Sequence, residues 1–345
     1  MRAGAGAADP GAGVASVSML QLFDLAGIYF RAFFAVPTST TSPDGRPVNA
    51  VRGSLDILAR VITDARPTRA IACLDLDWRP AWRVELIPSY KTHRVLEPQS
   101  TAAATVVELA GTPHSGTPGA SADIEVVPDE LSPQVPILLD VLAAIGIATA
   151  GAEGFEADDV IGTLTATERL DPIEVVTGDR DLFQVARDDD PTVCVRYIGA
   201  GMSKAAVYRA ADVANKYGIP PGGYADFAAL RGDPSDGLPG VPGVGDKTAA
   251  TLINRFGSIE GLLEAMDGRS TGLTASMRSK LTAAKDYLLV APKVVAVAAD
   301  APVVVTPDSD ELPREPVDPG RLSELVREHG IGGATARLVR AIAGE

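Results

Sequence analysis

Three apolar runs in the first half of the chain predict buried parallel strands, because they are continuous rather than alternating in polarity. The runs end at Asp24 (SMLQLFD), Asp75 (RAIACLD) and Asp179 (IEVVTGD). Helical spacing of apolar residues over 49–62 and 157–170 separates them. Alternating strands and helices predict an α/β doubly wound sheet, in which ligands bind at the carboxyl ends of the strands. All three Asp residues stand at such ends.

The pattern changes outside this region. The first residues are rich in Gly and Ala and lack the apolar core of a signal peptide, and GTPHSGTPGAS contains nothing apolar larger than Ala. Beyond about residue 205 the pattern is helical, and near the end a strand-like PVVVT precedes one helix around 320–342. We therefore expect a disordered tail over 1–18, an α/β domain over 19–205 with an extended, partly disordered loop over 95–134, a smaller helical domain over 206–300, and a C-terminal extension over 301–345.

Composition narrows the class of protein. The chain has 345 residues, of which 46% are hydrophobic and 22% charged, as in globular proteins. No stretch approaches the roughly 18 apolar residues that span a bilayer. Cys73 and Cys194 lie in strand-like runs, and the histidines have no partners at zinc spacing, which favours a reducing cytoplasm and argues against a zinc site. The net charge of −14 argues against a DNA partner unless the acids bind metal.

Further acids gather in three short motifs. GFEADDV contains Glu156, Asp158 and Asp159, TGDRD contains Asp179 and Asp181, and RGDPSDGLPG contains Asp233 and Asp236. Each acid alone is explained as a turn or a helix cap. Crowded carboxylates, however, repel and shift each other's pKa values, and hard cations such as Mg²⁺ remove that cost. The pattern therefore predicts two ions about 4 Å apart, the arrangement that clamps a phosphoryl group for in-line displacement.

The string GVPGVGDKTA predicts a tight hairpin that leads into a helix. Gly243 and Gly245 allow a close backbone approach, and the following N–H groups, with Lys247 and Thr248, form an anion site at the helix N-terminus. A DNA phosphate is the predicted ligand. An ordinary αα-hairpin and a nucleotide site are the alternatives, but the P-loop string GxxxxGK[ST] is absent here.

Basic residues follow the second acidic strand end. Lys91 and Arg94 in SYKTHR are three apart and would share one helical face. Their predicted role is to hold the scissile phosphate and stabilise its developing charge, and the alternative is a solvated basic stretch. Arg83 and Tyr90 precede them and are further candidates for DNA contacts, with a place in the core or as a wedge as the favoured alternative for Tyr90.

Taken together, the motifs resemble the 5′-nuclease family, which includes the 5′→3′ exonuclease domain of bacterial DNA polymerase I and the flap endonucleases. The matching strings are LFDLAGIYFRAF, ACLD followed by YKTHR, GFEADDV, VVTGDRDLFQ and RGDPSDGLPGVPGVGDKTA, in the family's order over roughly residues 19–300. The resemblance implies a Rossmann-like, PIN-like sheet, a helical arch over the long loop, and a helix–three-turn–helix region that binds DNA.

The resemblance also implies roles for individual residues. It assigns two or more Mg²⁺ or Mn²⁺ ions to nine ligands, namely Asp24, Asp75, Glu156, Asp158, Asp159, Asp179, Asp181, Asp233 and Asp236. Lys91 and Arg94, with Asp179, are the implied catalytic groups. A K⁺ ion is implied at hairpin carbonyls near Val241 to Val244. Four features depart from the family. Gly237 replaces a common Asn, Phe30 stands where Tyr is frequent, the spacing from Asp75 to Arg83 is one residue longer, and the segment after YKTHR is considerably longer.

These observations predict a stand-alone, monomeric, cytoplasmic enzyme similar to those of actinobacteria. It would be a 5′→3′ exonuclease and 5′-flap endonuclease that acts on nicked, gapped and flapped DNA in Okazaki-fragment maturation, RNA-primer removal and repair. A non-catalytic flap-binding relative is one alternative, although none of the nine acids is missing. A ribonuclease with a related metal site is the other, although the hairpin and the basic pair favour duplex DNA.

Overall fold

The computed structural model describes residues 18–95, 127–267 and 272–345. The predicted tail and most of the predicted arch lie outside these ranges. Within them, no helix has the length and apolar character needed to cross a membrane.

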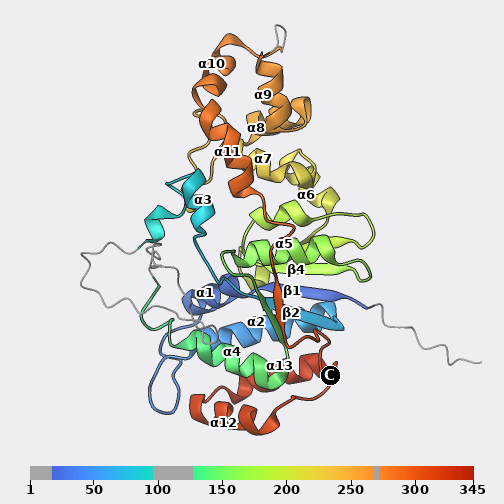
Figure 1. The fold of residues 1–345 in the computed structure, drawn as a ribbon. Helices are drawn as coiled ribbons and strands as arrows, with labels where there is room; N and C mark the ends of the chain where they lie inside the picture. Colours follow the sequence, from blue (N-terminus) through green and yellow to red (C-terminus); the bar gives the residue numbers. More distant parts are fainter. Residues whose placement is uncertain (1–17, 96–126, 268–271) are drawn as a thin grey trace, which may run out of the picture.

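A seven-stranded sheet forms the centre of the molecule, in the order β6-β5-β4-β1-β2-β3-β7 (Figure 1). The five inner strands are parallel, and the edge strands β6 and β7 are antiparallel. Their bounds are β1 Leu20–Asp24, β2 Arg69–Cys73, β3 Ala148–Gly151, β4 Ile173–Thr177, β5 Val193–Tyr197, β6 Ala206–Tyr208 and β7 Val304–Thr306. The prediction that the three acid-terminated runs are parallel strands is confirmed, because they are the neighbours β4, β1 and β2.

Both faces of the sheet are buried, which explains why the strand sequences are continuously apolar. Phe23, Ala72 and Val176 lie in the core on one face. Leu22 and Ile71 lie in the core on the other. Successive side chains of a strand point to opposite faces, so each strand contributes to both cores.

Five helices form the core on the first face, and α5 (Ala157–Thr167) packs on the second. The five are α1 Leu25–Ala35, α2 Asn49–Ala65, α4 Gln134–Ile145, α12 Pro319–His329 and α13 Gly332–Ala343. The prediction of one helix around 320–342 is wrong in detail. Gly330 has a φ of +65°, the left-handed conformation that ends a helix, so the chain forms α12 and α13 instead.

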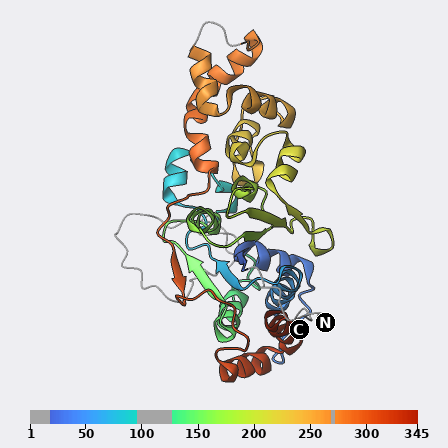
Figure 2. The same cartoon turned by 90° about the vertical axis from the view of Figure 1, so that its right-hand side faces the viewer.

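Residues 210–295 form a mainly helical region that projects from one end of the sheet, opposite α12 (Figures 1 and 2). Its helices are α6 Ala210–Tyr217, α7 Tyr224–Arg231, α8 Asp246–Phe256, α9 Ile259–Asp267, α10 Ala275–Ala283 and α11 Lys285–Val295, and α11 packs near the short α3 (Ala81–Leu86). Val160 of α5, Phe227 of α7 and Leu252 of α8 belong to one buried cluster. The helical region therefore shares its apolar core with the sheet, and this packing holds the predicted hairpin in place relative to the strand ends.

Candidate metal centre and DNA-binding surface

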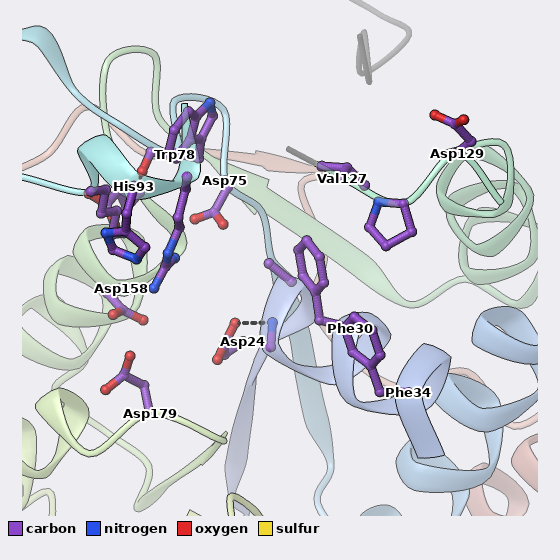
Figure 3. A pocket seen from close by; sticks show the side chains of 16 residues that line it. Asp24, Phe30, Phe34, Asp75, Trp78, His93, Val127, Asp129, Asp158 and Asp179 are labelled. Carbon is purple, nitrogen blue, oxygen red and sulfur yellow. Dashed lines mark hydrogen bonds and ion pairs between the residues drawn. The ribbon is translucent and has the colours of Figure 1, made fainter. Parts of the chain in front are cut away.

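An open pocket of about 810 Å³ lies at the carboxyl ends of the parallel strands (Figure 3). Five of the nine predicted metal ligands line it: Asp24, Asp75, Glu156, Asp158 and Asp179. They come from the ends of three adjacent strands and the first turn of α5. Because parallel strands end at the same edge of the sheet, acids that are far apart in sequence meet there.

Backbone and hydroxyl groups orient two of these acids. Asp24 caps α1, and its Oδ1 accepts a hydrogen bond of 2.8 Å from the Gly27 N–H. Its Oδ2 accepts one of 2.8 Å from the Thr177 hydroxyl. The Asp75 carboxylate accepts a hydrogen bond of 2.6 Å from the Ala157 N–H, at the start of α5. Each carboxylate is thus held at a strand end before any ligand binds.

Asp179 contacts two groups of acids, because it lines the pocket and also accepts a hydrogen bond of 2.8 Å from the Asp181 N–H. Burial is the main cause that raises the pKa values in both groups, and the negative charge of Asp179 raises them further. The residues affected in this way are Asp24 and Asp158, which line the pocket, and Asp181 and Asp236, which do not, with the pKa of Asp236 at about 6. Asp233 adds to the repulsion at Asp181. Eight of the nine predicted ligands therefore form one cluster of mutually repelling acids. Asp179 is the acid that interacts with both groups in this cluster.

The cluster suits hydrated hard cations. Within the described ranges, no three acids converge closely enough to form a ready-made site for one ion. Mg²⁺, however, keeps several of its waters and takes only one or two carboxylates directly. Carboxylates that repel one another around an open pocket fit ions bound largely through water.

Asp159 does not face the pocket, although it belongs to the same motif as Glu156 and Asp158. Its side chain is fully buried and receives two hydrogen bonds, of 2.6 and 2.8 Å, from the Arg83 guanidinium. It also accepts from the Ala298 N–H at 2.9 Å. In this structure Asp159 joins three segments of the chain, and the metal role implied for it does not fit this position.

Arg83 and Tyr90 are likewise buried rather than exposed to a DNA partner. Arg83 is 3% exposed and contacts Glu156 as well as Asp159. The Tyr90 hydroxyl donates a hydrogen bond of 2.7 Å to Glu156. The predicted DNA contacts of these two residues do not agree with this burial, since their polar groups are used to hold acids at the pocket.

Lys91 and Arg94 both line the pocket, but they do not share a helical face as expected, because Lys91 precedes the 3₁₀ turn Thr92–Arg94. Lys91 has a left-handed backbone with φ of +49°, which is uncommon for a residue with a side chain, and its ammonium group binds Glu156. Burial alone would lower the pKa of Lys91, but the charge of Glu156 raises it well above its ordinary value. Arg94 donates to the Ser235 carbonyl at 3.1 Å and pairs with Asp236 at 3.5 Å.

The loop that carries Lys91 is fastened to the loop that carries Asp236. The Lys91 N–H donates to the Asp236 carbonyl at 3.0 Å, and the Ser89 hydroxyl donates to the Gly237 carbonyl at 2.8 Å. A Cβ on Gly237 would overlap the Ser89 carbonyl oxygen. The glycine at position 237 is therefore explained by this close approach.

The hairpin predicted before α8 is exposed at Gly243, Gly245 and Lys247, and Thr248 is half-buried. Gly245 caps the N-terminus of α8, where the first backbone N–H groups of a helix lack intrahelical partners and can face an anion. The Thr248 N–H, however, already donates to the Gly245 carbonyl at 3.0 Å. Sequence reasoning missed Lys280 of α10, whose ammonium group would lie 2.5 Å from a Cβ on Gly243. Lys280 is far from the hairpin in the sequence, so no local motif indicates that the two lie together. Sequence reasoning also missed Thr177, although Thr177 lies within the VVTGD motif.

The chain matches two family models that together cover most of its length. Residues 19–218 match the 5′-3′ exonuclease N-terminal resolvase-like domain, and residues 219–319 match the 5′-3′ exonuclease C-terminal SAM fold. A 5′-3′ exonuclease of Mycobacterium tuberculosis is 51% identical over 94% of this chain and 98% of its own length. A 5′-3′ exonuclease of Streptomyces coelicolor is 49% identical over 93% of this chain and 99% of its own length.

Solved structures of a bacteriophage protein share the fold. The T5 5′-exonuclease with bound divalent metal ions (zinc) superposes with a TM-score of 0.58 at 16% identity, over 94% of this chain and 98% of its own. A pseudo-enzyme-product complex of the T5 flap endonuclease with DNA and metal ions gives 0.56 at 16% identity, over 94% and 97%. Together with the acid-lined pocket, the family matches and the two close relatives establish that this chain belongs to the 5′-3′ exonuclease family and is a hydrolase of that family.

Proposed function

We propose that the chain binds two or more Mg²⁺ or Mn²⁺ ions at the acid cluster and hydrolyses phosphodiester bonds near 5′ ends, nicks, gaps and 5′ flaps of DNA. The observation that carries the proposal is that Asp179 lines the pocket with Asp24, Asp75 and Asp158 and also accepts a hydrogen bond from the Asp181 N–H. Two ions about 4 Å apart are the arrangement that serves in-line phosphoryl displacement. The metal-bound and DNA-bound structures of the T5 protein support it.

The ions, when bound, would activate the attacking water and stabilise the leaving oxygen. The protein's own groups supply the rest. Asp24, Asp75 and Asp158 hold their carboxylates at the pocket, and Lys91 and Arg94 provide positive charge at the same place. Lys91 is held by Glu156 and Arg94 by the Asp236 loop, so both are poised to stabilise the charge that develops on the scissile phosphate.

The helical region over 206–300 is the proposed DNA-binding domain. Its hairpin offers Gly243, Gly245, Lys247 and Thr248 to a backbone phosphate, a contact that positions DNA without reading its sequence. A K⁺ ion at carbonyls near Val241 to Val244 would reinforce this site. The α/β part over 19–205 is the proposed catalytic domain, and 301–345 is an extension of it.

The proposed biological role is removal of RNA primers and flaps during Okazaki-fragment maturation and DNA repair, by a monomer in the cytoplasm. This finer assignment rests on the proposed cleavage of branched DNA, and the range of substrates cut tests it. An RNA-primed 5′ strand on a DNA template would be cut if the role is correct, whereas a free RNA strand would not.

The first experiment compares the wild type with Asp179→Asn on a 5′-flap and a nicked duplex, each with Mg²⁺ or Mn²⁺, with the products sized. We expect cleavage to fall by about a thousandfold or more, because one substitution disturbs both ion positions, as with other groups that act as a unit. Flap binding should persist. Asp300→Asn, at an exposed acid outside the pocket, is the matched control. Normal turnover by Asp179→Asn would overturn the metal assignment, and a wild type that binds flaps without cutting would favour the non-catalytic alternative.

A further inference from the structure

Arg31 of α1 reaches across to two loops at the carboxyl end of the sheet. Its Nη2 donates a hydrogen bond of 2.9 Å to the Gly178 carbonyl, after β4, and its Nη1 donates one of 2.8 Å to the Gly199 carbonyl, after β5. Its Nε is buried and has no hydrogen-bond partner in the described ranges. Both terminal nitrogens of the guanidinium are thus used to tie α1 to these two loops.

The Gly178 loop is the one that carries the shared acid. Gly178 directly precedes Asp179, and a Cβ at position 178 would overlap Nε of Arg31. Thr177 holds the same turn from the other side, because its hydroxyl oxygen accepts a hydrogen bond of 2.8 Å from the Asp179 N–H while donating to Asp24. The turn from Thr177 to Asp179 is therefore held between the strand and the guanidinium.

Asp179 needs such a restraint. It is exposed, and it faces acids on both sides whose charges repel it. Without a bound cation, repulsion favours a turn that swings Asp179 away from the cluster, so its placement has to come from the fold. Groups that orient a metal ligand from behind commonly change metal affinity or activity by 10–100-fold when they are removed.

We propose that Arg31 is a positioning residue for divalent-metal binding, which clamps the Thr177–Asp179 turn so that Asp179 is presented to both groups of acids. The inference rests on the proposed metal site. Arg31 donates its hydrogen bonds to backbone carbonyls, and its charge also lowers the pKa of Asp24, so it acts by positioning and charge from behind the acids. A direct phosphate contact is the competing role, but a phosphate would have to displace the two carbonyls that now hold the guanidinium.

The test measures metal binding and DNA binding separately on the full chain. Arg31→Met keeps the length of the side chain but removes charge and donors, and Gly178→Ala pushes the guanidinium away from the other side. Mn²⁺ affinity is measured without DNA, from the electron paramagnetic resonance signal of free Mn²⁺. Flap affinity is measured in EDTA at two salt concentrations. Arg60→Met is the matched control, since Arg60 is exposed and pairs only with Asp64 in the same helix among the described residues.

Both variants should weaken Mn²⁺ binding about tenfold and raise by the same factor the Mn²⁺ concentration needed for half-maximal cleavage. Flap affinity in EDTA and its salt dependence should match the wild type, as should every property of Arg60→Met. If Arg31→Met melts too low to measure, Arg31→Lys carries the test, because lysine keeps the charge but cannot bridge two carbonyls, and it too should bind Mn²⁺ more weakly.

Two results would overturn the inference. One is unchanged Mn²⁺ affinity in both variants. The other is a loss of flap affinity with a shallower salt dependence, which would assign Arg31 to a DNA phosphate. Failure of the proposed function looks different, because the wild type itself would then bind no Mn²⁺ or cut no DNA.

Discussion

The carboxyl group of Asp75 keeps its proton up to near-neutral pH, because burial raises its pKa. Burial is the main cause, Glu156 adds repulsion, and the pKa of Asp75 rises from 3.8 to about 7, with Lys91 and the Ala157 N–H opposing the shift. A divalent ion binds the ionised form, so metal and proton compete for this residue. The acid cluster therefore costs stability in the absence of metal, and that cost can be measured.

We predict that Asp75→Asn stabilises the metal-free protein increasingly as pH rises. A carboxyl whose pKa is higher in the folded state binds more protons folded than unfolded between about pH 4 and 7, so the wild type loses stability across that window. The neutral amide avoids this loss. Melting temperatures in EDTA should show a gap between variant and wild type that grows from pH 4 to 7 and is constant above.

Saturating Mg²⁺ at pH 8 should make the melting temperature of the wild type higher than that of Asp75→Asn, since only the wild type offers the Asp75 carboxylate to the ion. A gap that does not change with pH would contradict the raised pKa. Asp300→Asn serves as the control, because Asp300 is exposed.

The acids of the GFEADDV motif lie in different surroundings. Spacing in GFEADDV predicts that Glu156 and Asp159 share a helical face. In the structure Glu156 caps α5 from outside the helix, although both acids contact Arg83. Spacing does not indicate that Arg83, which is 76 positions away from Asp159, neutralises that acid inside the protein. The kind of chemistry could be predicted at residue scale, but the partner of each acid could not, because it comes from another segment.

At the scale of elements, two loops meet to complete the pocket. One carries Ser89 and Lys91, and the other is the 3₁₀ turn Pro234–Asp236 followed by Gly237. Gly237 has a φ of +70°, which Asn also tolerates, so conformation alone does not require glycine. The Ser89 carbonyl does require glycine, because its oxygen occupies the space that a side chain at position 237 would need.

We predict that Gly237→Asn lowers the cleavage rate about ten- to hundredfold by moving Lys91 relative to the acids. Duplex affinity, which depends on the hairpin, should change little. Single-turnover rates on a nicked duplex measure the effect. Gly45→Asn is the control, since Gly45 also has a positive φ but open space around it. Wild-type rates in Gly237→Asn would show that the loop tolerates the side chain.

The hairpin before α8 yields a prediction about DNA binding. Lys247→Ala should weaken duplex binding at every sequence and reduce the slope of log affinity against log salt by about one, the effect of losing one phosphate contact. Lys280→Ala should do the same, because its ammonium group lies beside Gly243. Lys285→Ala, which removes a lysine already paired with Asp267, should leave the slope unchanged. An unchanged slope in Lys247→Ala would remove the phosphate assignment.

At the scale of the molecule, the C-terminal extension is part of the α/β core. β7 pairs with β3 at the edge of the sheet, and α13 packs against α2. Arg69, at the start of β2, donates hydrogen bonds of 2.9 and 2.8 Å to the Asp310 carboxylate. It also donates to Glu168 and Asp171. The end of the chain thus closes over strands formed near its beginning.

We predict that removal of residues 301–345 abolishes cooperative folding. The deletion uncovers the surface against which Leu322, Leu325 and Leu338 are buried, and each such leucine contributes about 1.5–3 kcal/mol. Their sum approaches the whole stability of a domain, about 5–15 kcal/mol. Removal of the exposed Gly344–Glu345 alone is the control. Urea unfolding followed by circular dichroism measures both, and a wild-type transition in the truncated chain would contradict the prediction.

The amino-acid sequence by itself determined the parallel strands, the acids at their ends and the hairpin, because hydrophobic period and motif are local properties of the chain. Only the tertiary structure decided that Asp159 and Arg83 pair in the interior, that the Ser89 carbonyl packs against Gly237, and that β7 joins the sheet. Arg31 belongs with these, since its role depends on loops after β4 and β5. These contacts join segments far apart in sequence, and packing selects them only when the whole core forms.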